Sequence, residues 1–512
     1  DNGGRVVAMA AAARQLHSRL KAYASVETQP EFLSELVNAV DEFKRCCITS
    51  QDLAAAAAQS DGSLAQKLEE LALLLEAYDA LCAQGKQDPR DQMTWLLEQL
   101  EDCDFGKNHT FYIDGFPDFT RQHMAILEHL IQVSPTVTVG LNCDQPDSHT
   151  LAFEKAAQTA SQLILYAKKY GIPYEIVAIP EREDALSAVR GSLFQGSIPH
   201  DVKNLRVLRA NSTYTEVQAA AEHVLKLVQN GCRYRDISIV CADMASYQNI
   251  VDMVFGRCNI PVYRSGTEDI LRSTVISTVL SALDAALGGF EQRDVLRYLK
   301  SSVSGLDADT CDQLENYAVL WSIRGNRWGN TWTNHPDGIN ENWTEDAYTR
   351  LDSLNTAREA ALQPLFLLSE EFKEACNVSQ QVDALCAFLE RIGLEERLIQ
   401  LADQWDAAGD NRSAQILNQL WEILLSALEQ MGDVLGQTVW DSDSFVRLLT
   451  LLLSQYNVGT IPPVLDAVMV GPVSAMRCRQ AKHLIVLGAE EGALPGYSGS
   501  AGVLTDQERV TL

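Results

Sequence analysis

The chain has 512 residues, which is too many for one hydrophobic core and predicts several domains. Hydrophobic residues make up 46% and charged residues 21% of the sequence, which is typical of a folded globular chain and excludes an intrinsically disordered one. The formal net charge of −28 excludes a sequence-wide attraction for nucleic acid, so any contact with phosphate must come from a local basic patch or from a partner.

Several kinds of site are absent from the sequence. The twelve cysteines form no C-x-x-C pair, so neither a thiolate metal centre nor a dithiol redox motif is indicated, and we expect reduced thiols in a cytoplasmic protein. No uninterrupted run of about 18 apolar residues occurs, which excludes a membrane-spanning helix. The sequence contains no H-E-x-x-H and no G-x-S-x-G, so metalloprotease and serine hydrolase chemistry are not indicated.

The chain begins without Met and without an apolar signal segment, so we interpret it as a piece of a longer protein. Its first hundred residues carry apolar side chains at steps of three and four, the spacing of a buried helical stripe. The clearest stripe consists of Leu68, Leu71, Leu75, Tyr78 and Leu81. Ser60 and Asp61 are suitable N-caps for this helix, and Gly85 is a suitable C-terminal stop.

After residue 105 the pattern changes to short apolar runs separated by helical segments, which predicts parallel α/β units. Strands are expected at 110–113, 133–141, 174–179, 205–208, 237–241, 260–263, 467–470 and 484–488, with a polar joint at 180–204. Helical stripes dominate from about 268 to 455. We therefore predict a discontinuous α/β domain interrupted by a helical insertion, with Ile237–Val240 and Leu484–Leu487 in one parallel sheet.

Asp114 follows the first of these strands, at the strand end where α/β sheets place ligand-binding groups. In nucleotide motors an aspartate at such a position holds Mg²⁺, and the next residue is often a glutamate that orients the attacking water. Here the next residue is Gly115. We interpret Asp114 and Gly115 as the remnant of a nucleotide-binding site; the alternative is an aspartate that caps the following turn.

The sequence contains no G-x-x-x-x-G-K-[ST] loop. These residues therefore supply neither the backbone cradle for phosphates nor the lysine that contacts the β- and γ-phosphates. We conclude that the sequence encodes no complete ATPase site, and we assign it no catalytic residue, no metal site and no cofactor of its own.

Two groups of residues are candidates for contact with DNA. Arg477, Arg479 and Lys482 form a compact basic cluster next to a predicted strand end, where one interpretation is phosphate contact and the other is a solvated surface. Trp328 and Trp332 lie in a segment rich in tryptophan, asparagine and glycine, with arginines nearby. Their rings are candidates for stacking on single-stranded bases; the alternative is that they attach an irregular loop to a helical core.

Four motifs, in order along the chain, resemble the B subunit of bacterial ATP-dependent helicase/deoxyribonucleases (AddB). Residues 111–120 (FYIDGFPDFT) resemble the I-D-G-F-x-x-F-T stretch of that family, and residues 234–240 (YRDISIV) are similar to its Y-R-D-I-x-V-V strand entry. Residues 487–495 (LGAEEGALP) resemble the L-G-x-x-E-G-x-x-P turn that closes the second motor domain of UvrD-like helicases. Residues 502–509 (GVLTDQER) are similar to the L-L-T-D-x-E-R stretch that follows this turn.

The resemblance implies a two-subunit enzyme that unwinds and degrades double-strand DNA ends for recombinational repair. This chain would then have two kinds of partner, a helicase-nuclease subunit of the A type (AddA) and DNA, both as ends and as single strands. The resemblance also implies that the B subunit has a largely disabled motor, a C-terminal nuclease domain and an iron–sulfur cluster, and that it scans the strand for a regulatory sequence, Chi. The implied cofactors are ATP with Mg²⁺ and the cluster. By the same resemblance, the phosphate loop would precede Asp1, and the nuclease with the cluster cysteines would follow Leu512.

The strand pattern and the resemblance together predict an α/β fold of helicase-like (RecA-like) parallel-sheet domains with large helical insertions. The expected parts are a helical insertion of the 1B type at 1–105, the remainder of the first RecA-like domain at 106–204, a second RecA-like domain at 205–267 and 465–512, and a helical insertion of the 2B type at 268–464.

Four departures from active superfamily 1 helicases indicate a disabled motor. Gly115 stands in place of the catalytic glutamate, and Cys241-Ala242-Asp243 stands where a motor has an arginine for the γ-phosphate. Residues 143–146 (CDQP) lack the Q-x-x-Y-x-x-R-G sensor, and residues 471–477 (GPVSAMR) replace the T-x-H-x-x-K-G-L-E stretch. Each departure removes a positioned charge that phosphoryl transfer requires. We therefore predict a DNA-guiding and scaffolding segment; the alternatives are a purely structural partner-binding module and an independently active ATPase.

Overall fold

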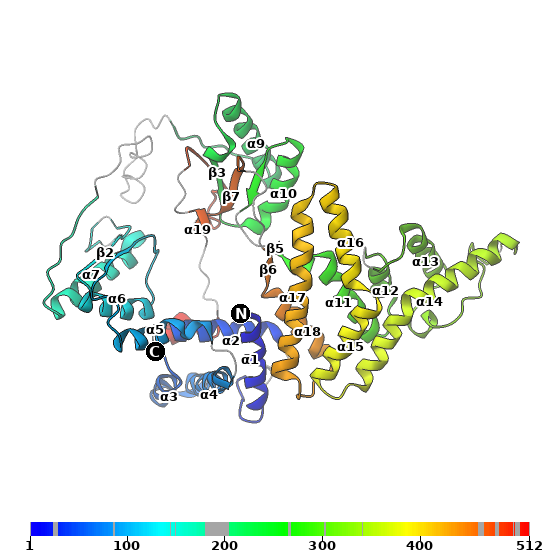
Figure 1. Ribbon diagram of the computed structural model, residues 1–512, viewed down its shortest axis with the longest axis horizontal. Helices are drawn as coiled ribbons and strands as arrows, with labels where there is room; N and C mark the ends of the chain where they lie inside the picture. Colours follow the sequence, from blue (N-terminus) through cyan, green and yellow to red (C-terminus); the bar gives the residue numbers. More distant parts are fainter. Residues whose placement is uncertain are drawn as a thin grey trace.

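The computed structural model is mostly helical, and its described residues form two small parallel sheets and one short antiparallel pair of strands (Figure 1). The structure describes residues 2–510 apart from 24–28, 85–87, 144, 149, 180–203, 265–267, 302–303, 340, 459–464, 477–480, 495 and 497–501. At this level the predicted α/β class with large helical regions is confirmed. The expected helix stop at Gly85 and nearly all of the polar joint lie outside the described residues.

Helices fill the N-terminal hundred residues, as the apolar spacing predicts. They are α1 (Asn2–Gln15), α2 (Pro30–Arg45), α3 (Ser50–Gln59), α4 (Gly62–Gln84), the 3-10 turn η2 (Pro89–Asp91) and α5 (Gln92–Glu101). The predicted stripe of α4 is buried, since Leu68 and Tyr78 are 0% exposed. α3 begins at a capping box, in which the Thr49 hydroxyl and the Asp52 carboxylate each accept the other's backbone N–H.

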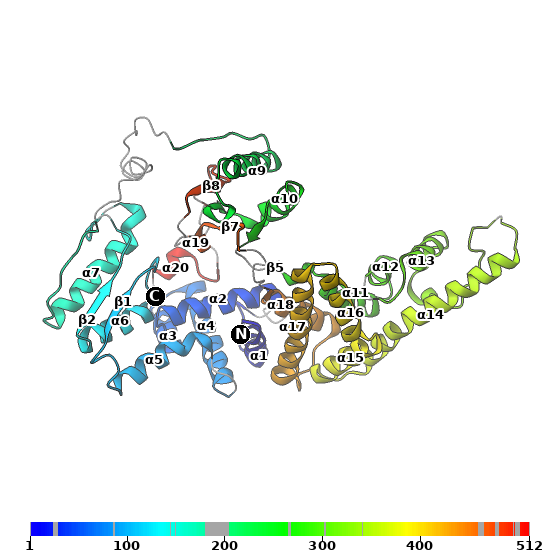
Figure 2. The ribbon, with the colours of Figure 1, turned by 45° about the horizontal axis from the view of Figure 1, so that its top comes forward.

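A parallel α/β unit follows. β1 (Thr110–Ile113) pairs with β2 (Thr136–Val139), and α6 (Arg121–Val133) is the crossover between them. α7 (Glu154–Lys169) comes after the 3-10 turn η3 (Leu151–Phe153), and α6 packs against both α5 and α7. Figure 2 shows this unit at one end of the molecule, next to the N-terminal helices.

Two of the expected strands do not form, so these predictions are wrong. Among the described residues, 174–179 and 205–208 are assigned to no strand, and Val177 and Val207 are 73% and 91% exposed. Both segments have the apolar composition of a strand. A strand also needs a neighbouring edge that offers its backbone groups, and the local sequence pattern carries no information about that edge.

The second sheet confirms the long-range strand pairing that the sequence predicts. Its strands lie in the order β4 (Val262–Arg264), β7 (Val468–Pro472), β3 (Ile237–Cys241) and β8 (His483–Leu487), and every pairing is parallel. Ile237 lies opposite His483, and Val240 lies opposite Val486. Two helices, α9 (Thr213–Gln229) and α10 (Met244–Arg257), share a hydrophobic core with this sheet and leave β3 fully buried. The 3-10 turn η4 (Tyr234–Asp236) precedes β3, and the short α19 (Val473–Met476) follows β7.

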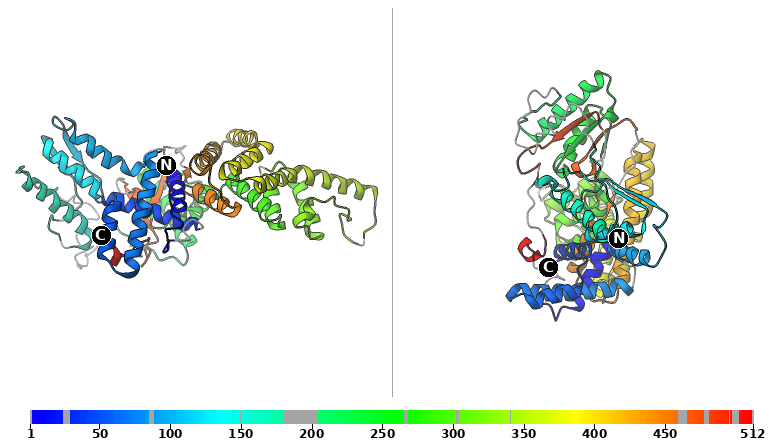
Figure 3. Two further views of the ribbon diagram at one scale, coloured as in Figure 1. Left: turned by 90° about the horizontal axis from the view of Figure 1, so that it is seen from below. Right: turned by 90° about the vertical axis from the view of Figure 1, so that its left-hand side faces the viewer.

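A large helical region separates β4 from β7 in sequence. The antiparallel pair β5 (Glu268–Asp269) and β6 (Asn457–Val458) joins its two ends. Between them lie η5 (Ile270–Arg272), α11 (Thr274–Leu287), α12 (Gln292–Leu299), α13 (Ala308–Leu320), η6 (Gly325–Trp328), α14 (Glu345–Glu374), α15 (Val378–Arg391), α16 (Leu394–Ala407), α17 (Asn411–Leu435) and α18 (Ser442–Ser454). Figure 3 shows this region extending away from the rest of the chain, with α14 at its far end.

The N-terminal helices and this helical region share one hydrophobic core. α1 packs against α17 and α18, and Val7, Met9 and Leu452 belong to the same buried cluster. Gly3 permits the close approach, because a Cβ atom there would lie 2.5 Å from Leu452 Cδ1. Two helical segments that are far apart in the sequence therefore form one continuous body.

The C-terminal helix α20 (Asp506–Arg509) packs on the N-terminal helices (Figure 2). Its first turn is a capping box between Thr505 and Glu508. Arg509 Nε donates a hydrogen bond to Glu42 Oε1 on α2 at 2.6 Å, and Lys67 Nζ on α4 lies 2.8 Å from Glu508 Oε1. The residues that resemble the L-L-T-D-x-E-R stretch thus connect the end of the described chain to its beginning.

Candidate functional site

Asp114 lies at the carboxyl ends of β1 and β2, as the sequence predicts. The Gly140 amide continues the strand pairing by donating to the Ile113 carbonyl at 2.8 Å. A Cβ atom on Gly140 would lie 2.6 Å from Asp114 Oδ1, so the absence of a side chain at Gly140 makes room for the carboxylate. The Gly115 amide donates to the same oxygen at 2.8 Å. This last bond joins Asp114 to the next residue and is compatible with both interpretations of Asp114.

Asp114 belongs to no cluster of metal-binding side chains among the described residues. Mg²⁺ is held in proteins by several oxygen ligands in octahedral geometry. Within the described part of the chain, no group of three or more acidic, histidine or cysteine side chains is arranged to hold a metal ion. We therefore derive no chemical step through a metal at Asp114.

The basic cluster expected next to β8 is only partly described. Arg477 and Arg479 lie outside the described residues. Lys482 Nζ lies 2.9 Å from Asp236 Oδ2, and the Lys482 amide donates to the Asp236 carbonyl at 2.9 Å. Lys482 therefore joins β8 to the turn that precedes β3, and its charge is balanced by that carboxylate.

Trp328 and Trp332 are buried in the helical region and present no ring face to a DNA strand. Trp328 is 0% exposed and Trp332 is 4% exposed. The Trp332 ring stacks on Tyr317 with centroids 4.3 Å apart, and the Arg358 guanidinium lies 5.5 Å from its centroid. The structure corrects the stacking interpretation and agrees with the alternative, in which these rings attach an irregular segment to a helical core.

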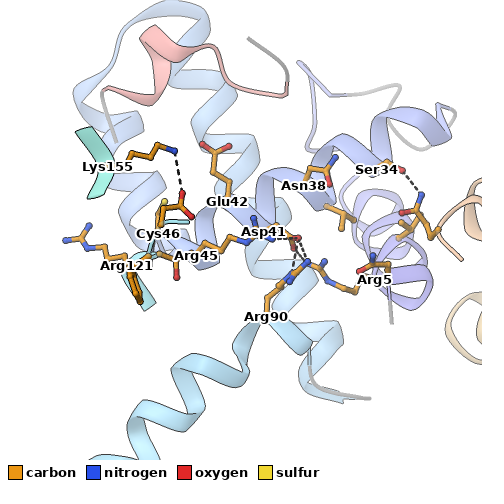
Figure 4. A pocket seen from close by; sticks show the side chains of 17 residues that line it. Arg5, Ser34, Asn38, Asp41, Glu42, Arg45, Cys46, Arg90, Arg121 and Lys155 are labelled. Carbon is orange, nitrogen blue, oxygen red and sulfur yellow. Dashed lines mark hydrogen bonds and ion pairs between the residues drawn. The ribbon is translucent and has the colours of Figure 1, made fainter. Parts of the chain in front are cut away.

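A cavity lies between α2 and the start of α6, and we call it the α2–α6 pocket (Figure 4). Its volume is about 840 Å³. Figure 4 shows Arg5 of α1 and Ser34 and Asn38 of α2 on one side, and Arg121 at the start of α6 and Lys155 of α7 on the other. Its charged lining residues are Arg5, Asp41, Glu42, Arg45, Arg90, Asp118, Arg121 and Lys155. Five cations and three carboxylates thus line this pocket in a chain whose net charge is −28.

Each carboxylate of the pocket has a cationic partner. Asp41 forms ion pairs with Arg5 and with Arg90, the second at 2.9 Å. Glu42 binds Arg509, as described above, and Asp118 lies 3.5 Å from Lys155 Nζ. The negative charges of the lining are therefore neutralised within the protein.

The charges of two arginines of the pocket are only weakly balanced by the described residues. Arg45 is half exposed, and within the described part of the chain its guanidinium pairs with Asp41 alone, at 3.9 Å. Arg121 is exposed at the first position of α6, and among the described residues its guanidinium forms no ion pair or hydrogen bond. Burial raises the pKa of the Cys46 thiol, and the charges of Arg121 and Arg45 oppose this rise.

A buried charge network supports Arg5, which lines the pocket. Arg5 is 5% exposed, and its Nε lies 3.0 Å from Asp88 Oδ1. Lys44 Nζ lies 3.1 Å from Asp88 Oδ2, and the Tyr78 hydroxyl donates to the same oxygen at 2.8 Å. Burial opposes the charge of Asp88, but the N–H of Arg90 and the charges of Arg5 and Lys44 outweigh it and hold the pKa of this carboxyl below its ordinary value.

Sequence reasoning missed this pocket. Arg5 stands at the head of an apolar helix, where it resembles an ordinary surface cation, and Asp88 stands in a short linker. The available signal was a charged residue on the buried face of a helix, because such residues are seldom fully buried unless they are paired. The partners come from four different helices and turns, so the sequence does not reveal the cluster.

The second sheet has a separate polar cluster at its carboxyl edge. Glu216 Oε1 accepts the Gly488 amide at 2.8 Å, and Glu216 Oε2 accepts the Tyr247 hydroxyl at 2.7 Å. After β3, the Asp243 carboxylate accepts the amides of Ala245 and Ser246 and thereby caps α10. This edge therefore presents carboxylates engaged with backbone amides.

None of the helices in the described part of the chain is both long and apolar enough to cross a membrane.

Comparison with known proteins identifies relatives along the whole chain. A family model described as "ADDB, N-terminal" matches residues 1–189. The chain is 29% identical over 533 residues to the B subunit of the ATP-dependent helicase/deoxyribonuclease of Thermoanaerobacter sp. (strain X514), in an alignment covering 99% of this chain and 46% of that protein. It is 28% identical to the corresponding protein from Caldanaerobacter subterraneus subsp. tengcongensis, over 96% of this chain and 44% of that protein.

The similarity covers nearly all of this chain, whereas the chain spans about half the length of the curated relatives it matches. The order of the four motifs, the family model and these relatives agree with one another. Residues 1–189 thus match the N-terminal model of the AddB family, and the chain as a whole is similar to a partial segment of the B subunits of ATP-dependent helicase/deoxyribonucleases.

Proposed function

We propose that this chain is the helicase-like, motor-inactive segment of a B subunit, and that it guides a DNA strand and supports a motor subunit of the A type. The observation that carries this proposal is the carboxyl edge of the second sheet. There Glu216 binds the Gly488 amide at the strand exit, and Asp243 caps α10. A motor needs positive charge at this edge to stabilise the negative charge of a transferring phosphoryl group. Carboxylates at the same place repel that group.

The proposed architecture is a pair of RecA-like domains. The parallel order β4-β7-β3-β8, in which strands about 200 residues apart in sequence pair directly, supports the second of these domains. The pair β1-β2, with Asp114 at its carboxyl edge, supports the first. The helical regions at 1–105 and 268–464 are then the insertions, and the domain boundaries stay as the sequence predicts them.

The substrates and partners are proposed from the family. The names of the relatives state a helicase and a deoxyribonuclease. We therefore propose double-strand DNA ends and single strands as the substrates of the assembly, in recombinational repair, and an AddA-type subunit as the partner. ATP with Mg²⁺ and an iron–sulfur cluster belong to the proposed assembly, and we assign their ligands to no residue of this segment.

One observation favours a second function, that of a purely structural module. The chain has a net charge of −28, and the two tryptophans that were candidates for base stacking are buried. Such a chain would hold the motor subunit without touching DNA.

Crosslinking within the assembled complex separates the two functions. The full-length B subunit with its A subunit would be bound to a DNA end whose single-stranded tail carries photoreactive thymines, and the crosslinked peptides would be identified by mass spectrometry. Guidance of the strand predicts crosslinks within residues 1–512. Crosslinks found only on the A subunit and on the remainder of the B subunit would favour the structural module.

A further inference from the structure

We propose that the α2–α6 pocket binds the phosphate backbone of a single DNA strand, with Arg45 and Arg121 at phosphates and Phe119 against a base. The inference rests on the proposed function, because it names the place where this segment would hold the guided strand. The relatives' names and the family model assign no role to this pocket.

The first step of the argument is the balance of charge. The carboxylates of the lining are neutralised by Arg5, Arg90, Lys155 and Arg509. Arg45 and Arg121 are left with most of their hydrogen-bond donors unused by the described residues. An arginine fork matches two oxygens of a phosphate, and such contacts supply most of the affinity of proteins for nucleic acid.

The second step is the rigidity of the support. Arg45 is the last residue of α2, the helix that carries Asp41 and Lys44 into the buried charge network. Arg121 is the first residue of α6, which begins at a capping box between Thr120 and His123, and both Thr120 and Arg121 line the pocket. The two guanidiniums therefore extend from fixed helix ends rather than from a loose surface.

The third step is the aromatic ring beside the cations. Phe119 lines the pocket and stacks on Phe116, with ring centroids 5.1 Å apart and planes 25° apart. A basic groove combined with an aromatic face is the arrangement by which proteins hold single strands without reading their sequence. The cavity of about 840 Å³ is within the range of about 300–1,000 Å³ that accommodates small organic ligands, so one nucleotide unit fits in it.

A natural thiol in the pocket can serve as a chemical probe of whether the pocket is occupied. Cys46, the residue after α2, lines the cavity. The neighbouring Cys47 has φ 55°, a conformation that glycine adopts without strain, so Cys47→Gly leaves one thiol in this peptide. Cys376, exposed in the helical region, is the control thiol in the same chain.

The experiment measures how fast iodoacetamide alkylates Cys46 in the full-length B subunit assembled with its A subunit, with and without an oligothymidylate. The strand concentration is set at about ten times its Kd, at which a ligand covering the site slows the alkylation roughly tenfold. We expect this slowing at Cys46 and no change at Cys376. The ratio of rates with and without the strand is compared, because each arginine also affects the thiol directly.

Variants test whether the slower alkylation of Cys46 depends on the two arginines. We expect the combined change Arg45→Ala with Arg121→Ala to abolish the protection of Cys46. The same change should lower the slope of log affinity against log salt by about one for each phosphate that is no longer neutralised. Arg293, whose side chain is 88% exposed in the helical region, is the matched control, and Arg293→Ala should change neither quantity.

Three outcomes would overturn the inference, and they differ in what they mean for the proposed function. If fluorescence anisotropy shows the strand bound while Cys46 reacts at an unchanged rate, the pocket is not the strand site, and the proposed function stands. If ATP or inorganic phosphate protects Cys46 as well as the strand does at equal phosphate concentration, the ligand is a free phosphate compound. If the complex binds no strand and forms no crosslink within residues 1–512, the inference fails together with the proposed function.

Discussion

Glu216 and Gly488 are 272 positions apart in the sequence, and the Glu216 carboxylate accepts the Gly488 amide at 2.8 Å. Glu216 lies in the first turn of α9, and Gly488 directly follows β8. The contact therefore fixes the exit of an edge strand to the helix that covers it. Burial and the hydrogen bond to Glu216 raise the pKa of Tyr247, which completes this cluster.

Gly488 should not tolerate a side chain. Its φ is 66°, and a Cβ atom there would lie 3.1 Å from the Tyr247 hydroxyl. We expect Gly488→Ala to destabilise the second sheet by about 1–3 kcal/mol, because the left-handed conformation and the close contact both oppose a methyl group. The measurement is hydrogen exchange in β3 and β8, which reports local opening in a chain with several domains.

Gly171 is the matched control for this substitution. It has φ 67°, but a Cβ atom there would meet nothing within 4 Å. Gly171→Ala should therefore show the conformational part of the cost alone, of about 1 kcal/mol. Equal effects of the two substitutions would show that the contact with Tyr247 contributes nothing.

Asp88 should stabilise the buried charge network that supports Arg5 at the α2–α6 pocket. Asp88→Asn keeps the shape of the side chain but leaves Arg5 and Lys44 without one buried counter-charge, so we expect a loss of about 3 kcal/mol in the free energy of local opening of α1 and α2. Hydrogen exchange in these helices measures it. Asp104→Asn, at an 87% exposed carboxylate paired with Lys107, should leave the exchange unchanged.

The effect of Asp88 should depend on pH in a defined direction. Its pKa is lower in the folded chain than in the unfolded chain, where a value of about 3.9 is expected. The stabilisation by its charged form is therefore present above about pH 4 and is lost as the pH falls through the folded value. The difference in opening free energy between Asp88→Asn and the natural chain should be constant between about pH 5 and 7 and should shrink in more acidic solution. A difference that grows on acidification would contradict this account.

Trp328 should matter for folding and not for DNA. Truncating a fully buried aromatic ring costs about 3–5 kcal/mol, so Trp328→Ala should greatly increase hydrogen exchange in α13 and α14. The affinity of the assembled complex for a single strand should stay the same, since the ring is inaccessible. Trp343→Ala is the control, because the Trp343 ring is 41% exposed and its removal should alter the exchange little. A selective loss of strand affinity in Trp328→Ala would restore the stacking interpretation.

The features that could be predicted from the sequence are those that depend on local patterns or on apolar segments. The pairing of β3 with β8 was predictable because 237–240 and 484–487 are both short, mainly apolar segments, although β8 is an edge strand on which Leu484 and Val486 are exposed. The buried stripe of α4 was predictable from its spacing. Asp114 was correctly placed at a strand end because the turn after β1 follows directly from the sequence.

The remaining features depend on partners that are distant in the sequence. The local sequence around Trp328 and Trp332 does not distinguish exposed rings from buried ones. The two rings are buried in the region where α13 packs against α14. The apolar segment 174–179 lacks a strand edge to join among the described residues. The α2–α6 pocket combines Arg45, Arg121 and Phe119, whose approach is set by the docking of two separate units.

The chain should not hydrolyse ATP, and Gly115→Glu should not restore hydrolysis. A glutamate can orient an attacking water, but it does not replace the phosphate cradle, the lysine or the arginine that phosphoryl transfer needs together with it. Because the members of such a unit act non-additively, restoring one of them recovers little of the rate. The structure adds a second reason, since Gly115 has φ 81°, and a glutamate there would be held in a strained conformation that aims its carboxylate poorly.

The measurement is phosphate release in the presence of single-stranded DNA, for the natural chain, for Gly115→Glu and for Asp114→Asn. We expect all three to give the rate of the buffer blank. Gly115→Ala is the control for backbone strain, because it carries the same conformational cost without a carboxylate. DNA-stimulated release that Asp114→Asn abolishes would mean that Asp114 holds a catalytic metal ion, and the carboxylates at the edge of the second sheet would then need another explanation.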